Sequence, residues 1–318
     1  MSILSSPSAP VALIAGPTAS GKSAIAVALA HRLAQAGRRG VIINADSAQV
    51  YADLRVLSAR PSDDEMEGIE HRLFGAWDGA EACSAAAWAA RAKAEIEECH
   101  ASDVVPILVG GTGLYLRVLL EGIAPIPAID PDVRAMVRAL PDDGAYKLLQ
   151  VEDPLRAAEL APTDRQRIAR ALEVKRSTGV TLADWQMAKA GGIGDDIDLH
   201  PLVLMPDRTW LYERCDLRFA AMLQAGAVAE VEALLARGLD PDLPVMRAIG
   251  VPEIAAFLSD ALPREAMIAA GQQATRNFAK RQFTWFRRQV PDDWVRANIG
   301  PESETVDFET YFASLLRK

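Results

Sequence analysis

The residues with the clearest chemical potential form one glycine-rich loop: Gly16, Pro17, Thr18, Ala19, Ser20, Gly21, Lys22 and Ser23. The loop follows an apolar run over residues 11–15 and precedes an alanine-rich run over 24–30, the order strand, loop, helix. In this pattern backbone N–H groups and the helix N-terminus bind a phosphate chain, Lys22 holds its far end, and the Ser23 hydroxyl binds Mg²⁺. The loop therefore predicts a diphosphate or triphosphate ligand and is typical of nucleotide-binding, chiefly ATP-binding, proteins. The alternative is a structural turn that carries a surface lysine.

A carboxylate is placed to join this loop. Residues 41–45 are a second apolar run, which predicts a short buried strand ending at Asp46. Because ligands gather at the carboxyl ends of strands in an open parallel sheet, we expect Asp46 in the same crevice as Lys22. The apolar run before Gly110 ends without an acidic residue, so Asp46 is the nearest candidate to join Ser23 as a Mg²⁺ ligand. A helix or turn cap is the alternative role for an aspartate followed by serine.

The elements that must position these residues alternate between strand and helix. Residues 104–109 are a third apolar run, which enters the glycine-rich segment 110–113, and residues 202–205 predict a strand that rejoins the sheet. The alternation predicts an α/β fold, a P-loop NTPase-like parallel sheet flanked by helices.

Between these strands the composition changes. Prolines punctuate the chain after residue 122, where the patterns are short and helical without a convincing strand. We therefore expect an all-helical insertion domain over 123–199 and a core domain over 1–122 and 200–318. From Asp207 onward the pattern is helical, and no further strand is expected.

The composition limits the class of protein. The chain has 318 residues, 50% hydrophobic and 24% charged, with a net charge of −9, as in a globular protein of the cytoplasm. No apolar run could cross a bilayer, and the first residues lack the basic region of a signal peptide, so we expect no membrane partner. Three cysteines without C-x-x-C spacing indicate neither a disulfide framework nor a zinc site. Without self-complementary apolar helices, we expect a monomer.

Two basic segments, 165–176 and 276–288, run against the acidic average. Residues 275–288 contain five basic residues and no acidic one, interleaved with aromatic side chains. This composition suits a single-stranded RNA loop, because bases stack on aromatic rings while phosphates meet arginine and lysine. The aromatic residues could equally form the core face of a helix, and we expect Trp285 to be mostly core. A solvated basic face is the alternative for the first segment.

The motifs together resemble a known family. Six segments occur in the order found in the bacterial tRNA dimethylallyltransferases (tRNA isopentenyltransferases): residues 16–23, 46–51, 110–115, 164–170, 247–250 and 275–287. The resemblance covers nearly the whole chain. It implies transfer of the dimethylallyl group of dimethylallyl diphosphate to N6 of the adenosine just 3′ of the anticodon in tRNA, with release of diphosphate and Mg²⁺ as cofactor.

The resemblance also implies catalytic roles. Asp46 matches the general base of the family, which accepts the proton of the attacking amine. Arg218 aligns with the arginine that the family directs at the diphosphate, and a guanidinium fork suits phosphate oxygens. Arg214, one turn earlier, is the alternative. Thr18 is expected to add a hydroxyl donor to the leaving group.

The partner is expected to be the tRNA anticodon stem-loop. Gln49 is suited to bidentate reading of an adenine edge, with a surface amide as the alternative, and Thr112 could contact tRNA or cap a helix. The residues that we expect to contact tRNA are Asp46, Ser47, Ala48, Gln49, Thr112, Arg134, Gln166, Arg167, Ile168, Ala169, Arg170, Arg247, Lys280, Arg281 and Arg287.

The chain departs from the family pattern in two places. Residues 56–61 read V-L-S-A-R-P where the family usually has I-G-T-A-K-P, so the loss of the glycine puts the backbone path of that loop in doubt. After Gly250, V-P-E replaces the more usual aromatic-Lys-Glu. The competing hypotheses are a P-loop small-molecule kinase, a prenyltransferase of free adenine nucleotides, and a nucleotide-gated RNA-binding protein without catalysis.

Overall fold

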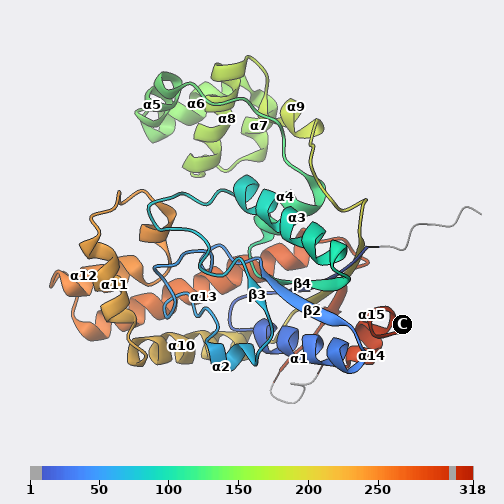
Figure 1. Ribbon diagram of the computed structural model, residues 1–318. Helices are drawn as coiled ribbons and strands as arrows, with labels where there is room; N and C mark the ends of the chain where they lie inside the picture. The colour runs from blue at the N-terminus through green and yellow to red at the C-terminus, as the bar shows by residue number, and fades with distance from the viewer. Residues whose placement is uncertain (1–8, 301–305, 318) are drawn as a thin grey trace, which may run out of the picture. The chain divides into compact units, whose positions relative to one another are not determined.

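The computed structural model describes residues 9–300 and 306–317 (Figure 1). Contacts along the chain divide it into two compact units: a core unit, Met1–Leu119 with Gly194–Lys318, and an insertion unit, Leu120–Ile193. The expected boundary at 199 falls inside the first residues of a strand, Asp198–Leu204. The first residues of this strand include polar side chains and are only half-buried, so they do not form the apolar run from which a strand is predicted.

The core unit is built on a six-stranded sheet in the order β3-β2-β4-β1-β5-β6, with every described pairing parallel. The strands are β1 Pro10–Ala15, β2 Arg39–Asn44, β3 His71–Arg72, β4 Val104–Gly110, β5 Asp198–Leu204 and β6 Val295–Ala297. Helix α1 (Lys22–Gln35) covers one face, and α3 (Ala85–Ala101) and α4 (Gly113–Glu121) cover the other (Figure 1). The expected parallel sheet flanked by helices is confirmed.

The register brings the strand ends together. Ala15, the last residue of β1, pairs with Gly110 of β4 on one side and with Val203 of β5 on the other. Gly110 must be glycine, because a Cβ there would lie 2.1 Å from the carbonyl oxygen of Ala45. The loops that follow β1, β2 and β4 therefore meet at one edge of the sheet, as ligand-binding loops do in open parallel sheets.

Two short edge strands were not predicted from the sequence. The expectation that the chain after Asp207 contains no strand is wrong, since β6 pairs with the last residues of β5. It is three residues long and mostly exposed, so neither length nor burial produces a pattern. Strand β3 has only two residues.

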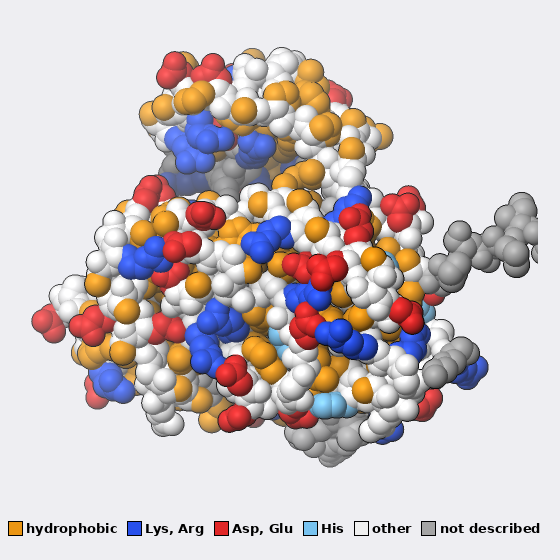
Figure 2. Space-filling model, in the orientation of Figure 1, with side chains coloured by type: hydrophobic (Ala, Val, Ile, Leu, Met, Phe, Trp, Pro, Cys, Tyr) orange, Lys and Arg blue, Asp and Glu red, His pale blue; other side chains and the backbone are white. Residues whose placement is uncertain are grey.

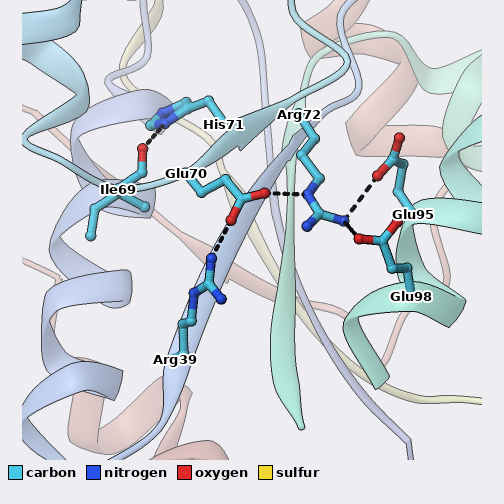
Figure 3. Close-up of polar contacts among 7 residues, drawn as sticks. All are labelled: Arg39, Ile69, Glu70, His71, Arg72, Glu95 and Glu98. Carbon is cyan, nitrogen blue, oxygen red and sulfur yellow. Dashed lines mark hydrogen bonds and ion pairs between the residues drawn. The ribbon is translucent and has the colours of Figure 1, made fainter. Parts of the chain in front are cut away.

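Charged side chains hold β3 at its edge (Figure 3). Glu70 forms an ion pair with Arg39 of β2 and accepts a hydrogen bond from Arg72 Nε at 2.7 Å. Arg72 Nη1 lies 3.0 Å from Glu95 and 3.1 Å from Glu98 on α3. These contacts tie the chain at β3 to its one neighbouring strand, β2, and to helix α3, and they add to a ladder of only two residue pairs.

The rest of the core unit is helical. The long helices are α10 Arg208–Gln224, α11 Ala227–Ala236, α12 Val251–Leu258 and α13 Arg264–Arg288, and the short ones are α2 Asp63–Met66, α14 Phe308–Tyr311, α15 Ala313–Leu316 and a 3-10 helix, Pro244–Arg247. Helix α13 approaches α10 closely, because a Cβ on Gly271 would lie 2.1 Å from the buried ring of Phe219. In the described part of the chain no single helix has the length and apolarity to cross a membrane; only α10 and α11 taken together, bent by 67°, do.

The insertion unit contains α5 Pro131–Arg138, α6 Asp142–Glu152, α7 Pro154–Glu159, α8 Arg165–Thr178 and α9 Leu182–Met187. Helix α8 is capped at both ends: Asp164 Oδ1 accepts a hydrogen bond from the N–H of Arg167 at 3.2 Å, and Gly179 has a positive φ of 75°. Its buried face, with Ile168 and Leu172, packs against Leu149 of α6. No strand occurs among the described residues of this unit, so the predicted all-helical insertion is confirmed.

Candidate active site

The glycine-rich loop lies between β1 and α1, as its pattern predicts. Gly21 has a φ of 89° and is the N-cap of α1, and Ala19 also has a left-handed backbone, with a φ of 62°. Such strain in a residue other than glycine is typical of functional loops. The turn opens the helix N-terminus toward a ligand, which makes the loop an anion site.

Lys22 and Asp46 line the same cavity, of about 710 Å³, together with Thr18, Ser23 and Arg218. The structure therefore brings the loop and the strand-end carboxylate together. Lys22 Nζ donates a hydrogen bond to the Pro17 carbonyl at 2.6 Å. Burial lowers the pKa of Lys22 to about 8, against the opposing effect of the negative Asp46 and with a smaller lowering from Arg218.

The backbone around Asp46 is fixed by Asn44, a buried side chain that sequence reasoning missed. Asn44 Oδ1 accepts the N–H of Asp46 at 2.8 Å, and its Nδ2 donates to the carbonyls of Asp46 at 3.0 Å and Leu73 at 3.1 Å. An amide ending an otherwise apolar strand is the signal that could have indicated it.

The carboxylate of Asp46 is only partly used in this turn. Its Oδ1 accepts the N–H of Ala48 at 2.9 Å, so the capping role considered from the sequence is present. Its Oδ2 accepts no hydrogen bond from the residues that the structure describes, and it remains available to a ligand.

Thr112 supports the Asp46 turn from the neighbouring strand end. Its Oγ1 accepts the N–H of Ser47 at 2.9 Å and donates to Ser47 Oγ at 3.2 Å. Its own N–H donates to the Ala45 carbonyl at 3.2 Å. Thr112 therefore connects the loops after β2 and β4.

Gln282 connects two loops of the site and was also missed. It lies on α13 and is 5% exposed. Its Oε1 accepts the N–H of Thr18 at 2.7 Å, and its Nε2 donates to the Gly111 carbonyl at 2.9 Å. One amide thus holds the glycine-rich loop 16–23, the candidate phosphate loop, and the loop after β4 at a set separation. Its spacing with the buried Ala279 and Phe286 marks the core face of the helix.

A second cavity, of about 280 Å³, adjoins the first and is largely apolar. Aromatic and aliphatic side chains line it: Tyr51, Leu54, Leu57, Tyr115, Phe219, Met222 and Phe278. The hydroxyl of Tyr51 accepts the N–H of Cys83 at 3.1 Å, and that of Tyr115 donates to the Cys83 carbonyl at 3.4 Å. With both hydroxyls paired, the two tyrosines present their rings, and not a free hydroxyl, to this cavity.

Three residues line both cavities: Thr18, Asp46 and Arg218. Burial lowers the pKa of the Arg218 guanidinium, and the negative Asp46 opposes this effect. Arg214 is held differently, since its Nε donates to the Ala19 carbonyl at 2.9 Å and its guanidinium lies 4.6 Å from the centre of the Trp210 ring. A hydroxyl, a carboxylate and a guanidinium therefore lie where the cavity beside the glycine-rich loop meets the apolar cavity.

The donor set around the phosphate loop fits Mg²⁺ carried in by a phosphate ligand. Among residues 9–300 and 306–317, no group of three or more His, Cys, Asp or Glu could hold a metal ion. Ser23 and Asp46 line the same cavity. One hydroxyl and one carboxylate are typical of Mg²⁺ sites completed by substrate phosphates and water.

Comparison with known proteins identifies the family. Residues 49–289 match the family model described as IPP transferase. The tRNA dimethylallyltransferase of Erythrobacter litoralis is 66% identical over 300 residues, which cover 94% of this chain and 93% of that protein. This chain belongs to the IPP transferase family.

Solved structures agree with this assignment. A crystal structure of the tRNA isopentenylpyrophosphate transferase of Bacillus halodurans is 29% identical, with a TM-score of 0.69 and 96% of each chain covered. A structure of a eukaryotic dimethylallyltransferase acting on tRNA gives a TM-score of 0.79 at 26% identity, covering 96% of this chain and 77% of that chain.

In this IPP transferase the unusual loop over 56–61 follows a well-supported path. Glu230 of α11 accepts the N–H groups of Arg55, Val56 and Leu57 at 2.6–2.8 Å. Leu57 does not have a positive φ and packs against Gly250, where an added Cβ would lie 2.7 Å from it. The leucine is therefore accommodated without the freedom of glycine.

Gln49 also supports this loop. Its Nε2 donates to the carbonyls of Ser58 at 3.2 Å and Ala59 at 2.9 Å. Both N–H groups of the amide are thus used within the protein, whereas bidentate reading of an adenine would need one of them free, beside the Oε1 acceptor. The structure assigns the Gln49 amide to the loop.

The other RNA candidates of the IPP transferase differ in exposure. Ser47, Ala48, Arg247 and Arg281 line the apolar cavity, and Lys280 and Arg287 lie exposed on the same helix, α13, as Arg281. Trp285 is half-buried against Gly113. In the insertion unit Arg134, Gln166 and Arg167 are exposed and Arg170 is half-exposed, whereas Ile168 is buried in the core with Ala169 packed beside it. The side chain of Ile168 therefore positions its neighbours and does not contact a ligand.

Proposed function

We propose that this IPP transferase transfers the dimethylallyl group of dimethylallyl diphosphate to N6 of the adenosine 3′ to the anticodon in tRNA. The observation that carries the proposal is the set of Thr18, Asp46 and Arg218, which lines both a phosphate cavity and an apolar cavity. An allylic diphosphate has the same two parts, a charged end and a five-carbon apolar end. The reacting carbon–oxygen bond would then lie where the two cavities meet.

Different residues of the site act on the two parts of the reaction, bond breaking and bond formation. The bond between the allylic carbon and the diphosphate oxygen breaks, and its electron pair leaves with diphosphate; Lys22, Arg218, Thr18 and the loop N–H groups stabilise that charge. The N6 lone pair forms the new carbon–nitrogen bond, and Asp46 Oδ2 accepts the N6 proton. Bound Mg²⁺, held by the Ser23 hydroxyl and the phosphate oxygens, would further neutralise the diphosphate and would leave Asp46 Oδ2 free for the proton. We further propose that the protein acts in the cytoplasm as a monomer.

The test uses an unmodified anticodon stem-loop RNA, dimethylallyl diphosphate and Mg²⁺, followed by mass spectrometry of the RNA. We expect a gain of one C5H8 unit per RNA, and none in a matched RNA with guanosine at the same position. Gain on free adenosine monophosphate alone would indicate a prenyltransferase of free nucleotides. No gain with any RNA, accompanied by ATP turnover, would indicate a kinase and refute the proposal.

The charge of Lys22 predicts a pH dependence. Because its pKa is about 8 in the free enzyme, the ammonium loses its proton as the pH rises through 8, and diphosphate binding weakens. At saturating RNA, kcat/KM for dimethylallyl diphosphate should fall about tenfold per pH unit above that point. Lys22→Arg should move this fall to higher pH. If kcat/KM of Lys22→Arg still falls above pH 8 as in the unmodified protein, the fall is due to the titration of another group.

Gln282→Leu tests the amide that joins two loops. We expect the single-turnover rate to fall by about tenfold to 100-fold, because small displacements of a site cost this much. Thermal unfolding should show a modest loss of stability, since the Thr18 N–H and the Gly111 carbonyl lose their partner. The control is Gln273→Leu, an exposed position on the same helix. Equal rates for the two variants would contradict the positioning role.

A further inference from the structure

One buried carboxylate in the insertion unit faces three arginines. The Glu173 side chain, on α8, is 5% exposed, and its Oε1 lies 3.2 Å from Arg138 Nε. Its Oε2 lies 4.0 Å from Arg134 Nε and 4.0 Å from Arg170 Nη1. Arg134 and Arg138 are one turn apart on α5, and Arg170 is one turn before Glu173 on α8, so two packed helices supply the group.

The group carries more positive charge than its carboxylate can neutralise. Three guanidinium groups around one carboxylate leave a net charge of +2. The arginine side chains remain 42–65% exposed although the carboxylate is buried. A carboxylate needs one cation to offset its burial, and each further arginine repels the first. The surplus charge therefore faces solvent around one buried carboxylate, which accepts a hydrogen bond from Arg138 and lies 4.0 Å from the other two arginines.

Other ion pairs described in this unit join one cation to one carboxylate. Arg176 pairs with Glu152 at 2.6 Å and Lys147 with Asp143 at 3.0 Å. The Glu173 group thus differs from these pairs, because three arginines surround one carboxylate. Figure 2 shows Lys and Arg side chains gathered on one face of this unit.

We propose that Glu173 positions Arg134, Arg138 and Arg170 as one surface that binds the sugar–phosphate backbone of RNA. This inference rests on the proposed function, in which RNA is the substrate. Guanidinium forks bind phosphate oxygens in pairs, and holding the forks beforehand reduces the entropy lost on binding. Backbone contacts of this kind fix the position of an RNA without reading its sequence. Arg138 and Glu173 are new members of the site.

The variant Glu173→Gln distinguishes two effects on RNA binding: the net charge of the surface and the positioning of its arginines by Glu173. The substitution makes the surface more positive by one unit, so attraction by net charge alone predicts tighter RNA binding. Positioning predicts weaker binding, with a three- to tenfold rise in Kd at physiological salt and about the same loss for different stem sequences. The measurement is fluorescence anisotropy of a labelled anticodon stem-loop without dimethylallyl diphosphate. Tighter binding by a folded variant would overturn the proposal.

Arg138→Ala tests the surface even if Glu173→Gln fails to fold. Replacing this exposed arginine should raise the Kd for RNA three- to tenfold. It should also reduce the slope of log K against log salt by about 0.7 to 0.9. Lys147→Ala, an exposed cation on α6, is the matched control and should leave both values unchanged. Equal effects of the two variants would contradict a specific surface. Because binding is measured without the prenyl donor, a failure here is distinct from a failure of the transfer reaction.

Discussion

Asp46→Asn is expected to lower the single-turnover rate of dimethylallyl transfer by about 100-fold or more, with the affinity for tRNA nearly unchanged. Asparagine is almost isosteric, and its Oδ1 can still accept the Ala48 N–H that Asp46 accepts at 2.9 Å. The turn set by Asn44 and Thr112 should therefore persist. What the substitution removes is the basic oxygen at the boundary of the two cavities.

The measurement is rapid quenching of enzyme mixed with both substrates at saturating concentrations, so that binding does not limit the rate. Asp63→Asn, an exposed carboxylate on α2, serves as the control and should react like the unmodified protein. A near-normal rate for Asp46→Asn would show that another group, or water, accepts the N6 proton.

Arg218→Gln is expected to reduce kcat by about 10²- to 10³-fold, the usual cost of removing one donor that stabilises developing negative charge. The guanidinium lies at both cavities, and its burial, seen in the lowering of its pKa, strengthens its interaction with a departing diphosphate. Diphosphate should also become a weaker product inhibitor.

Arg214→Gln is the matched control for Arg218, one turn earlier on α10. Its Nε already donates to Ala19 and its guanidinium lies over Trp210, so we expect less than about a tenfold loss. Partial recovery of Arg218→Ala by added guanidinium ion would support direct contact with the leaving group. A larger loss of kcat for Arg214→Gln than for Arg218→Gln would mean that Arg214, and not Arg218, stabilises the leaving diphosphate.

Much of the site was predictable because it depends on local patterns. Residues 16–23 carry their own strand, loop and helix, and Asp46 ends an apolar run; parallel strands must end at the same edge, so the two meet. The same reasoning predicted the sheet but not β3 or β6. Strands of two and three residues are too short for a periodic pattern.

Two side chains that sequence reasoning missed act across long separations. Gln282 meets Thr18 across 264 positions, and Glu230 meets Val56 across 174. Both are polar residues whose partners are backbone groups. Because every residue has a backbone, the residue types in the sequence do not show which group is the partner. Gln49 shows the converse, since its residue type suggested a base contact while its amide binds neighbouring carbonyls.

The hydrogen bonds of Gln282 imply thermodynamic coupling between the two substrates. Helix α13 carries Gln282 on its buried face and Lys280, Arg281 and Arg287 on its exposed face. Any RNA that displaces this helix also displaces the N–H of Thr18 in the phosphate loop. Linkage then requires the diphosphate substrate to change the affinity for RNA by the same factor as RNA changes the affinity for the diphosphate.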